Sequence, residues 1–356
     1  MSELSTSEVL ARRLTNLRLS RPGTSAAELA DWFGAMQAQD LASGKWSLGV
    51  RLPGSTEADI DDALAAGEVM RTWPMRGTIH IVHPANAHWL LDLTGVRALN
   101  GVQKRWDNLK LDKSTVDRAA GVLATALRGK RLTRAECLAA LEDAGIDTAG
   151  GRAYHLLWHT AQIGITCIGP NQGSEQTFVL LDEWAPRPRN PVREEALAML
   201  ATRYFRSHGP TTRADFQGWT GLTATDAKQA VAAADLDAAR FQGKEVFFVD
   251  GEVDDPQEIM LLPGFDEFLL GYKDRSAFLD REHADFVVPG GNGMFKATVV
   301  RRGKVIGTWQ RKMLTRKVQI TITGFARIPA KARKAVEAPA ARYADFVDKD
   351  LELVFA

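Results

Sequence analysis

The chain has 356 residues, with 45 Lys and Arg against 44 Asp and Glu and a formal net charge of +1. Its 45% hydrophobic and 25% charged content excludes low-complexity, collagen-like and wholly disordered proteins. No apolar run approaches the roughly 18–20 residues that span a bilayer, and the N-terminus has no basic and apolar leader. A cytoplasmic protein without a membrane partner is therefore expected. Two cysteines, Cys137 and Cys167, are too few for a disulfide framework or a four-thiolate zinc site.

Capping boxes predict where many helices start. In a capping box, a Ser or Thr is followed three residues later by an acid, and each satisfies a free amide at the helix start. The boxes are Ser5…Glu8, Ser25…Glu28, Thr56…Asp59, Ser114…Asp117, Thr133…Glu136, Thr212…Asp215 and Thr223…Asp226. Together with apolar residues at helical spacing, they predict helices near 5–18, 25–37, 57–66, 115–128, 134–143, 150–163, 192–207, 213–219 and 224–234.

After each third helix the apolar period changes from 3.6 to 2, which predicts a β-hairpin. The predicted hairpins are 69–73 with 78–82 across Pro74, 163–168 with 177–181 across the Gly-rich 169–174, and 239–242 with 245–249, turning at Gly243-Lys244. Three helices followed by a hairpin is the order of a winged helix. We therefore predict three tandem winged-helix units, 1–112, 113–188 and 189–255, and the recurrence of Thr133-Arg134-Ala135-Glu136 as Thr212-Arg213-Ala214-Asp215 supports a duplication.

The last part of the chain, 256–356, has a different pattern. Short alternating segments predict strands at 259–263, 285–288, 296–300, 304–308, 319–324 and 351–355, with turns at 290–293 and 302–303. A final helix is predicted from Pro329 to about Tyr343. The fold class expected for the whole chain is α+β, with a small C-terminal β-barrel after the winged helices.

Charge is segregated along the chain although the net charge is near zero. The window 286–334 contains no acid, whereas 225–258 contains nine acids against three bases. A basic face of this kind favours a polyanion as partner, although a solvated strand face that only maintains solubility is the alternative. The basic residues of the first window are Lys296, Arg301, Arg302, Lys304, Arg311, Lys312, Arg316, Lys317, Arg327, Lys331, Arg333 and Lys334.

Motifs for metal, cofactor or nucleophilic chemistry are weak. His155 and His159 are four residues apart, but Leu156 replaces the general-base Glu of a zinc helix. His80, His83 and His88 are assigned structural roles, because no partnered nucleophile accompanies them. Neither a Gly-x-Ser-x-Gly motif nor a phosphate-binding loop occurs. We therefore expect no metal and no cofactor.

The segment Gly34-Ala35-Met36-Gln37-Ala38-Gln39-Asp40 places two glutamines near the end of a predicted helix. If the chain becomes extended there, Gln37 and Gln39 fall on the same side, because extended residues alternate. Their carbonyls can orient a water or face a cation, although neither can act as a base. Capping of the helix end is the alternative, and neither side chain is expected in the core.

Three segments carry a family resemblance over nearly the whole chain. They are Gly34–Asp40, Thr72-Trp73-Pro74-Met75-Arg76-Gly77-Thr78-Ile79-His80 and Leu261-Leu262-Pro263-Gly264-Phe265-Asp266. In this order they resemble the winged-helix DNA glycosylases of the YcaQ and AlkZ family. The resemblance implies a concave basic DNA-binding surface and a monofunctional, nucleoid-associated, monomeric enzyme that acts on double-stranded DNA.

The resemblance also assigns the chemistry. It implies hydrolysis of N7-alkylated purines, bulky adducts and azinomycin-type interstrand crosslinks included, with Gln37 and Gln39 as catalytic residues. YcaQ-like members have Asp at the second position, so this chain joins the Gln-x-Gln branch, with Ala38 in the middle. The predicted DNA contacts are Gly290, Gly291, Asn292, Gly293, Lys296, Arg301, Arg302, Arg311, Lys312, Arg316 and Lys317. A winged-helix transcriptional regulator without catalysis is the alternative; a nuclease or lyase is disfavoured, because neither a metal cluster nor a Schiff-base lysine is evident.

Overall fold

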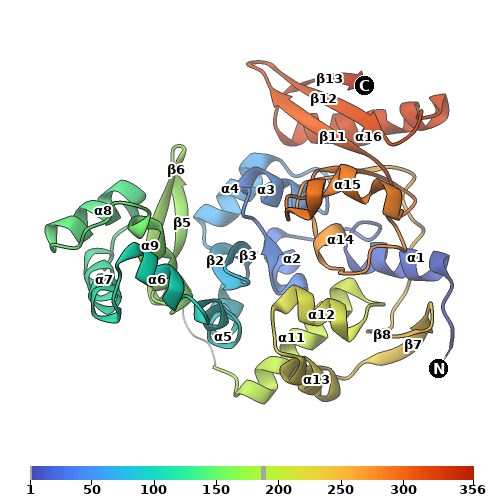
Figure 1. Ribbon diagram of the computed structural model, residues 1–356. Coiled ribbons are helices and arrows are strands. Elements are labelled where there is room, and N and C mark those ends of the chain that lie inside the picture. The colour runs from blue at the N-terminus through green and yellow to red at the C-terminus, as the bar shows by residue number, and fades with distance from the viewer. Residues whose placement is uncertain (1, 186–189) are drawn as a thin grey trace.

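The structure, a computed structural model, describes residues 2–185 and 190–356. Figure 1 shows a green lobe beside a blue N-terminal region, with the third helical region below and a red C-terminal sheet above. The mixed α+β class is confirmed, whereas the predicted unit boundary at 188/189 lies outside the described residues. Within the described ranges, no helix has the length and apolarity needed to cross a membrane.

The N-terminal region contains helices on both sides of the β2–β3 hairpin, which ends at Val82. Its elements are α1 (Thr6–Asn16), α2 (Ala26–Phe33), β1 (Met36–Gln37), α3 (Leu41–Gly49), α4 (Glu57–Ala65), β2 (Met70–Met75), β3 (Thr78–Val82), α5 (Pro84–Leu93), the 3-10 helix η1 (Gly95–Leu99) and α6 (Gln103–Leu109). α1, α2 and α4 were predicted. The predicted helix over 25–37 is too long, because Gly34 has a φ of 80° and ends α2.

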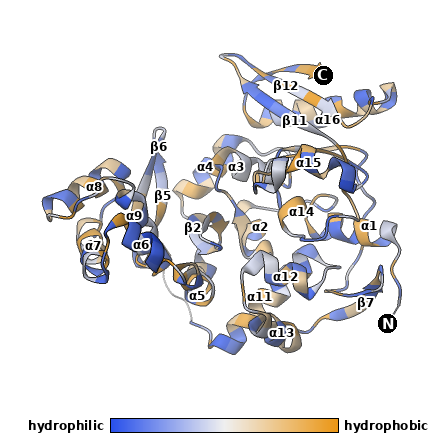
Figure 2. Cartoon of the chain, in the orientation of Figure 1, coloured by the Kyte–Doolittle hydropathy of each residue, from blue (hydrophilic) through white to orange (hydrophobic). Residues whose placement is uncertain are grey.

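The second and third regions repeat the order of helices followed by a hairpin. The second contains α7 (Lys113–Ala126), β4 (Leu132–Thr133), α8 (Arg134–Asp143), α9 (Arg152–Gln162), β5 (Thr166–Gln172), β6 (Glu175–Leu180) and α10 (Leu181–Trp184). The third contains α11 (Arg193–His208), α12 (Arg213–Thr220), α13 (Ala224–Ala233), β7 (Asp237–Phe241) and β8 (Lys244–Phe248). Both hydrophilic and hydrophobic residues occur along the helices of these regions (Figure 2).

Local capping explains most helix starts. Complete capping boxes occur at α1, α4, α8 and α12. Ser25 and Thr223 cap α2 and α13 by accepting one backbone N–H each. The box predicted at Ser114 is wrong, because Asp112 caps α7 and accepts the N–H of Thr115 at 2.7 Å.

The first two hairpins join in one sheet, with strand order β1-β3-β2-β5-β6-β4. Arg71 of β2 is paired with Ile168 of β5. Pro74 is not the turn of the first hairpin; it lies inside β2, where the register shifts between Thr72 and Met75. Likewise, β5 continues past Gly169 to Gln172. The third hairpin, β7-β8, is separate. The division into three winged-helix units therefore stays a prediction.

The C-terminal region contains an open sheet rather than the predicted barrel. Its elements are β9 (Met260–Leu262), α14 (Glu267–Leu270), η2 (Arg281–His283), α15 (Ala284–Val287), η3 (Pro289–Gly291), β10 (Thr298–Arg301), β11 (Lys304–Met313), β12 (Lys317–Gly324), α16 (Ala330–Phe346) and β13 (Asp350–Phe355). The order is β13-β12-β11-β10-β9, and no pairing of β13 with β9 is present among the described residues. Helix α16 packs against β9, β12 and β13 and buries Val336, Ala340 and Tyr343, so a helix completes this layer.

Two further predictions in this region are wrong. Residues 285–287 belong to α15, and Val288 follows it, so this segment is not a strand. Gly290–Gly293 is consequently not the tip of a hairpin, but a turn that begins with η3. The N–H of Gly290 donates to Asp285 Oδ1 at 2.7 Å, and that of Met294 donates to Asn292 Oδ1 at 2.8 Å. These side-chain acceptors replace the strand pairing.

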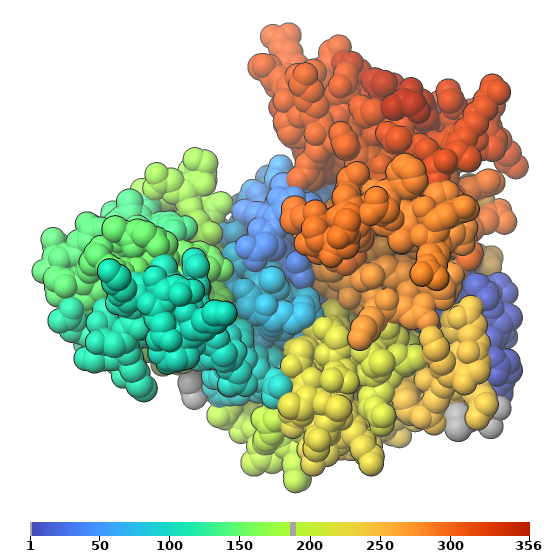
Figure 3. Space-filling view, in the orientation of Figure 1, coloured from blue at the N-terminus to red at the C-terminus, as the bar shows by residue number. Residues whose placement is uncertain are grey.

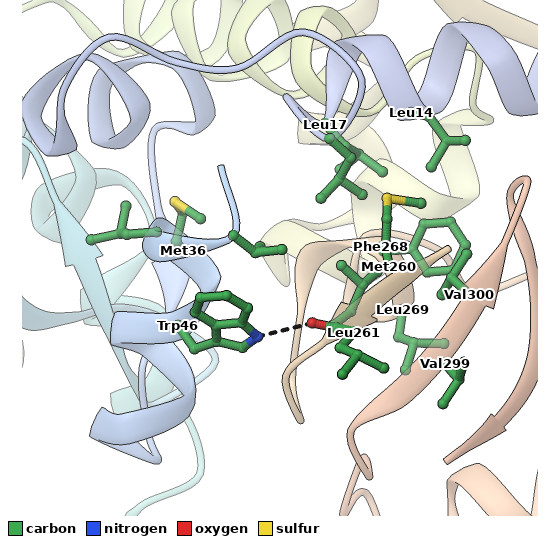
Figure 4. Packing of buried hydrophobic residues seen from close by; sticks show 14 of the residues in the cluster. Leu14, Leu17, Met36, Trp46, Met260, Leu261, Phe268, Leu269, Val299 and Val300 are labelled. Atoms are coloured by element: carbon green, nitrogen blue, oxygen red, sulfur yellow. Dashed lines mark hydrogen bonds between the residues drawn. The ribbon is translucent and has the colours of Figure 1, made fainter. Parts of the chain in front are cut away.

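One hydrophobic cluster joins the N-terminal region to the C-terminal sheet. It contains Leu14, Trp46, Leu261 and Val299 among many others. Trp46 Nε1 donates to the Leu261 carbonyl at 2.9 Å, as Figure 4 shows. This bond joins two residues that are 215 positions apart in the sequence, so distant segments are packed together. Because Met36 of β1 and Phe268 of α14 belong to this cluster, the core fixes the positions of β1 and α14 relative to each other.

Candidate active site

The two predicted glutamines lie on an extended segment directly after α2. β1 pairs antiparallel with β3, so that Gln37 is opposite His80. The N–H of Ala38 then donates to the Ile79 carbonyl at 2.8 Å. The expectation that the chain straightens here is confirmed, and the sharp end of α2 at Gly34 is the local cause. The side-chain carbonyl of Gln37 is therefore presented from β1 and that of Gln39 from the bend that follows it, rather than from a helix end.

The carbonyls of both glutamines accept hydrogen bonds from the β2–β3 hairpin. Gln37 Oε1 accepts from Arg76 Nη2 at 3.1 Å, and Gln39 Oε1 accepts from the Ile79 N–H at 3.0 Å. Gln39 is exposed, but Gln37 is only 9% exposed, so the expectation that Gln37 lies outside the core is wrong. Each carbonyl oxygen has a second lone pair. Both can therefore still face a substrate.

Arg76 reaches Gln37 because of a tight turn. Met75 is paired with Thr78, and the two residues between them, Arg76 and Gly77, have φ values of 52° and 69°. Positive φ at both central residues is the requirement of a type I′ turn, whose twist matches the strands. The Arg76 side chain thus folds back from the turn, and its guanidinium is partly buried against Gln37, where burial lowers its pKa. It brings a guanidinium cation to the carbonyl of Gln37.

His80 lies beside the same guanidinium. Its Nδ1 is 2.9 Å from the Thr78 carbonyl, and its Nε2 is 3.4 Å from Arg76 Nη2. These partners assign the Nδ1–H tautomer, with Nε2 as the acceptor. Burial, with the positive charge of Arg76 beside it, lowers the pKa of His80 to about 3. The ring is therefore neutral at neutral pH.

A buried carboxylate supports Gln37 from the other side. Glu267, at the start of α14, is 1% exposed, and its Oε1 accepts the backbone N–H of Gln37 at 3.0 Å. Its Oε2 accepts from Trp219 Nε1 at 2.8 Å and lies 3.3 Å from His208 Nε2. Burial opposes the charged form, but the bonds from His208, Gln37 and Trp219 outweigh it and lower the pKa of Glu267 to about 2. Glu267 is an anion in the folded protein.

Asp266, the last residue of the Leu261–Asp266 segment, fixes Glu267 in place. Both Asp266 and Arg51 are fully buried, with donor–acceptor distances of 2.7 and 2.9 Å in a bidentate pair. Asp266 also accepts the Ser47 hydroxyl at 2.8 Å and caps α14 through the N–H of Phe268. The aspartate of this segment therefore anchors α14 to α3, and the neighbouring Glu267 is presented to Gln37.

The predicted DNA-contacting cations lie at both ends of β11. Arg301 and Arg302 are at the β10–β11 turn, where both pair with Glu258, at 2.8 and 2.5 Å. A Cβ on Gly303 of that turn would lie 3.3 Å from Leu10 of α1, so the turn packs against α1. β11 has 10 residues, and at about 3.3 Å per residue its ends lie about 30 Å apart. The basic window therefore does not form one compact patch.

The other end of β11 carries the remaining cations. Arg311 lies 3.6 Å from Asp40, beside the Gln-x-Gln segment, and Lys317 lies 3.6 Å from Glu352. Lys312 and Arg316 are exposed near the tip of the β11–β12 hairpin. The tip projects beyond the rest of the red sheet in Figure 1. Lys296 and the 290–293 turn are exposed as well, after α15. A DNA-binding role for all of these residues stays a prediction.

The histidine pair at His155 and His159 is engaged in packing. Arg105 Nε donates to His155 Nε2 at 3.0 Å, and the His159 ring packs edge-on against Trp106 at 5.3 Å. Among residues 2–185 and 190–356, no three His, Cys, Asp or Glu side chains gather closely enough to hold a metal ion. A depression of about 660 Å³ beside α12 and β8 is lined by Thr212, Lys244 and Lys273 among others, and by neither glutamine.

Sequence reasoning missed Arg76, Glu267, His208 and Trp219. Arg76-Gly77 is a turn signal inside the Thr72–His80 segment, and Glu267 directly follows Asp266. These two could have been found as neighbours of the family motifs. His208 and Trp219 come from α11 and α12, and no local pattern indicates that they meet Glu267.

Comparison with known proteins supports a relationship over the whole chain. The model of the family described as DNA glycosylase AlkZ-like matches residues 30–346. The interstrand DNA cross-link repair glycosylase of Streptomyces sahachiroi is 26% identical in an alignment of 352 positions that covers 91% of this chain and 91% of the relative. The structure of Streptomyces sahachiroi DNA glycosylase AlkZ has a TM-score of 0.82 at 24% identity and covers 99% of this chain and 100% of that one, so the fold is shared. With nine-tenths of its length matched by the family model, this chain belongs to the AlkZ-like DNA glycosylase family.

Proposed function

We propose that this protein is a monofunctional DNA glycosylase that hydrolyses the N-glycosidic bond of N7-alkylated purines. The observation that carries the proposal is the contact between Gln37 Oε1 and the Arg76 guanidinium at 3.1 Å. A carbonyl that already accepts from a cation is suited to face a cationic deoxyribose. Gln39, two residues further on in the bend after β1, supplies a second carbonyl.

The reaction needs little acid or base assistance. Alkylation at N7 makes the purine a cation and hence a good leaving group, so no general acid has to protonate it. The sugar then develops oxocarbenium character, as in glycoside hydrolysis. Carbonyl dipoles of Gln37 and Gln39 stabilise this charge and orient the water that attacks C1′. In known cases one preorganised hydrogen-bonding group contributes about 2.7–4 kcal/mol to the rate.

DNA is proposed to contact the hairpin of β11 and β12 and the 290–293 turn. Lys312, Arg316 and Lys317 supply positive charge for phosphates. Met313 and Leu314, between them at the tip, are 47% and 37% exposed, which is unusual for large apolar side chains. Apolar tips flanked by cations suit insertion into a groove. Arg311, held near Asp40, connects this hairpin to the Gln-x-Gln segment.

Bulky N7 adducts and azinomycin-type crosslinks are the proposed substrates within double-stranded DNA. The support is the Streptomyces sahachiroi relative, whose name specifies interstrand cross-link repair. Figure 3 shows blue N-terminal atoms between the green lobe and the orange and yellow segments. Action as a monomer is also proposed.

Release of free modified base tests the activity. Duplex DNA with a single N7-methylguanine is incubated with the protein, and half of each sample is then treated with alkali. A monofunctional glycosylase releases N7-methylguanine and leaves a site that breaks only after alkali. A transcriptional regulator binds the duplex without releasing base, whereas a nuclease or lyase breaks the strand without alkali. A Gln37→Ala, Gln39→Ala double variant is the matched control for contaminating activities.

A further inference from the structure

The site proposed for hydrolysis contains two opposite charges, one on each side of Gln37. The backbone N–H of Gln37 donates to Glu267 at 3.0 Å, and its side-chain carbonyl accepts from Arg76 at 3.1 Å. Neither glutamine can carry charge. The electrostatic potential at the site therefore depends on groups that have not been assigned a role in the reaction.

The two charges differ in how firmly they are held. Glu267 is 1% exposed, is bonded by Gln37 and Trp219, and is next in sequence to the buried Asp266–Arg51 pair. Arg76 sits on a two-residue turn, and its guanidinium, whose pKa is lowered by burial, contacts Gln37 through Nη2 and lies 3.4 Å from His80 Nε2. A long side chain on a turn can move by rotating about its own bonds. The anion is held by several hydrogen bonds in the core, whereas the cation is held at the site by a single terminal nitrogen at the end of a long side chain.

The neighbours of Glu267 define its surroundings. His208 Nε2 lies 3.3 Å away on the α11 side, and Trp219 donates from α12. His80, on β3, is neutral at neutral pH. Tyr204 stacks on His208 with ring centroids 4.6 Å apart. The carboxylate is thus enclosed by rings and amides in a water-poor environment, where charge interactions are stronger than in solvent.

We propose that Glu267 is a positioning residue that holds the Gln37 strand and supplies the negative charge which favours a cationic sugar, and that Arg76 is a placeholder cation displaced when that sugar binds. The inference rests on the proposed glycosylase function. A neutral carboxamide pair alone would stabilise the oxocarbenium ion only through dipoles, whose effect falls more steeply with distance than that of a charge. In the free protein Arg76 balances Glu267. In the complex the substrate takes over that balance.

Two abasic analogues test the proposal without requiring excision. A duplex with a pyrrolidine abasic nucleotide carries a cation at the sugar position, and a duplex with a tetrahydrofuran abasic nucleotide is its neutral counterpart. The measured quantity is the ratio of the two dissociation constants at neutral pH and fixed salt. We expect the unaltered protein to favour the cationic duplex by about tenfold, which corresponds to about 1.4 kcal/mol.

Substitutions on the two sides of Gln37 should change this ratio in opposite directions. Glu267→Gln keeps an acceptor for Gln37 but removes the charge, so the preference should fall toward one while tetrahydrofuran affinity is retained. Arg76→Met removes the competing cation, so the preference should rise. Glu267→Asp, which keeps the charge, should restore part of it. Glu252→Gln is the control: the same exchange at an 89% exposed side chain paired with Arg21.

The outcomes separate the two proposals. Equal loss of affinity for both duplexes in Glu267→Gln would show a merely structural role and overturn the inference, as would a lower preference in Arg76→Met. If Glu267→Gln does not fold, as judged by circular dichroism, Glu267→Asp and Arg76→Met still decide the question. N7-methylguanine release by the unaltered protein is measured in parallel. Release without any preference for the cationic duplex rejects only the role of Glu267 and Arg76, whereas absence of release rejects the proposed function.

Discussion

At the scale of single residues, the site consists of side chains whose charge states are set by burial and by their partners. Gln37 and Gln39 are neutral at every pH. His80 is kept neutral and Glu267 ionised, since burial and Arg76 act on the first while hydrogen bonds stabilise the second. The pKa of both groups is lowered, which leaves His80 without charge and Glu267 with a negative charge at neutral pH. Predictions on the reaction rate and on stability follow from these charge states.

Removing either glutamine should slow base release. We expect Gln37→Ala or Gln39→Ala to reduce the single-turnover rate on N7-methylguanine duplex by about 10–1,000-fold, or about 1.4–4 kcal/mol. The double variant should be impaired by less than the product of the two single effects, because the two carbonyls act on one water. Gln39→Glu should retain some activity. Gln37→Ala should also cost about 1 kcal/mol of stability, since a buried hydrogen bond is removed. Unchanged rates would return both residues to structural roles.

His80 should make the protein less stable in mild acid. Its folded pKa is lowered from 6.5 to about 3, so between these values the unfolded chain binds a proton that the folded protein excludes. Stability is complete above about pH 6.5 and decreases as the pH falls. From pH 7 to 5 the decrease should be about 2 kcal/mol greater in the natural protein than in His80→Gln. Urea unfolding at both pH values measures the difference, and parallel behaviour of the two proteins would contradict it.

At the scale of elements, turns with positive φ position the functional hairpins. Arg76-Gly77, Gln242-Gly243 and Arg302-Gly303 all have positive φ at both residues. Each is a two-residue connection of an antiparallel pair. The β11–β12 hairpin is different: its tip carries exposed cations and apolar residues, and this is the element expected to contact DNA.

Charge reversal at the β11–β12 tip should weaken binding to any DNA sequence. Lys312→Glu with Arg316→Glu prevents both side chains from binding phosphates, so fewer counterions are released. The slope of log K against log salt should become shallower by about 1 for each phosphate that is no longer bound. Fluorescence anisotropy over a salt series measures both affinity and slope. Arg302→Glu, at the opposite end of β11, tests whether that end also contacts DNA. Binding that does not depend on salt would rule out a basic DNA face.

Shortening the 290–293 turn should impair excision without unfolding the protein. Gly290, Gly291 and Gly293 all have positive φ and open space around them, so the turn is shaped to approach another molecule closely. Deletion of Gly290 and Gly291 should lower the excision rate several-fold while the melting temperature stays nearly constant. A fully active shortened protein would leave the turn as a plain surface loop.

At the scale of the whole molecule, buried contacts between distant segments hold the site together. The Asp266–Arg51 pair joins residues 215 apart, and the cluster around Trp46 surrounds the same junction. Asp266→Asn leaves a buried guanidinium without its partner charge and should destabilise the protein by about 3–5 kcal/mol. Urea unfolding measures the change. Asp254→Asn, which removes an exposed partner of Arg21, should change stability little. Equal effects would mean that the buried pair is not the anchor.

Helix starts, most hairpins and the extended segment at Gln37 could be predicted from the amino-acid order, because each depends on nearby residues, while the catalytic role of Gln37 and Gln39 stays a prediction. The Ser5–Glu8 box is such a local feature, whereas the end of α2 at Gly34 was predicted three residues too late. The predicted barrel was wrong, because the sheet stays open and α16 packs against it. The predicted strand at 285–288 and the hairpin tip at 290–293 were also wrong, because α15 forms there and the Asp285 carboxylate accepts the N–H of Gly290. Folding alone brings Glu267 to Gln37 across 230 residues. Packing of α3, α11 and α12 around Asp266 and Glu267 produces that contact. It cannot be predicted from the spacing of residues along the chain, because these helices are far apart in the sequence.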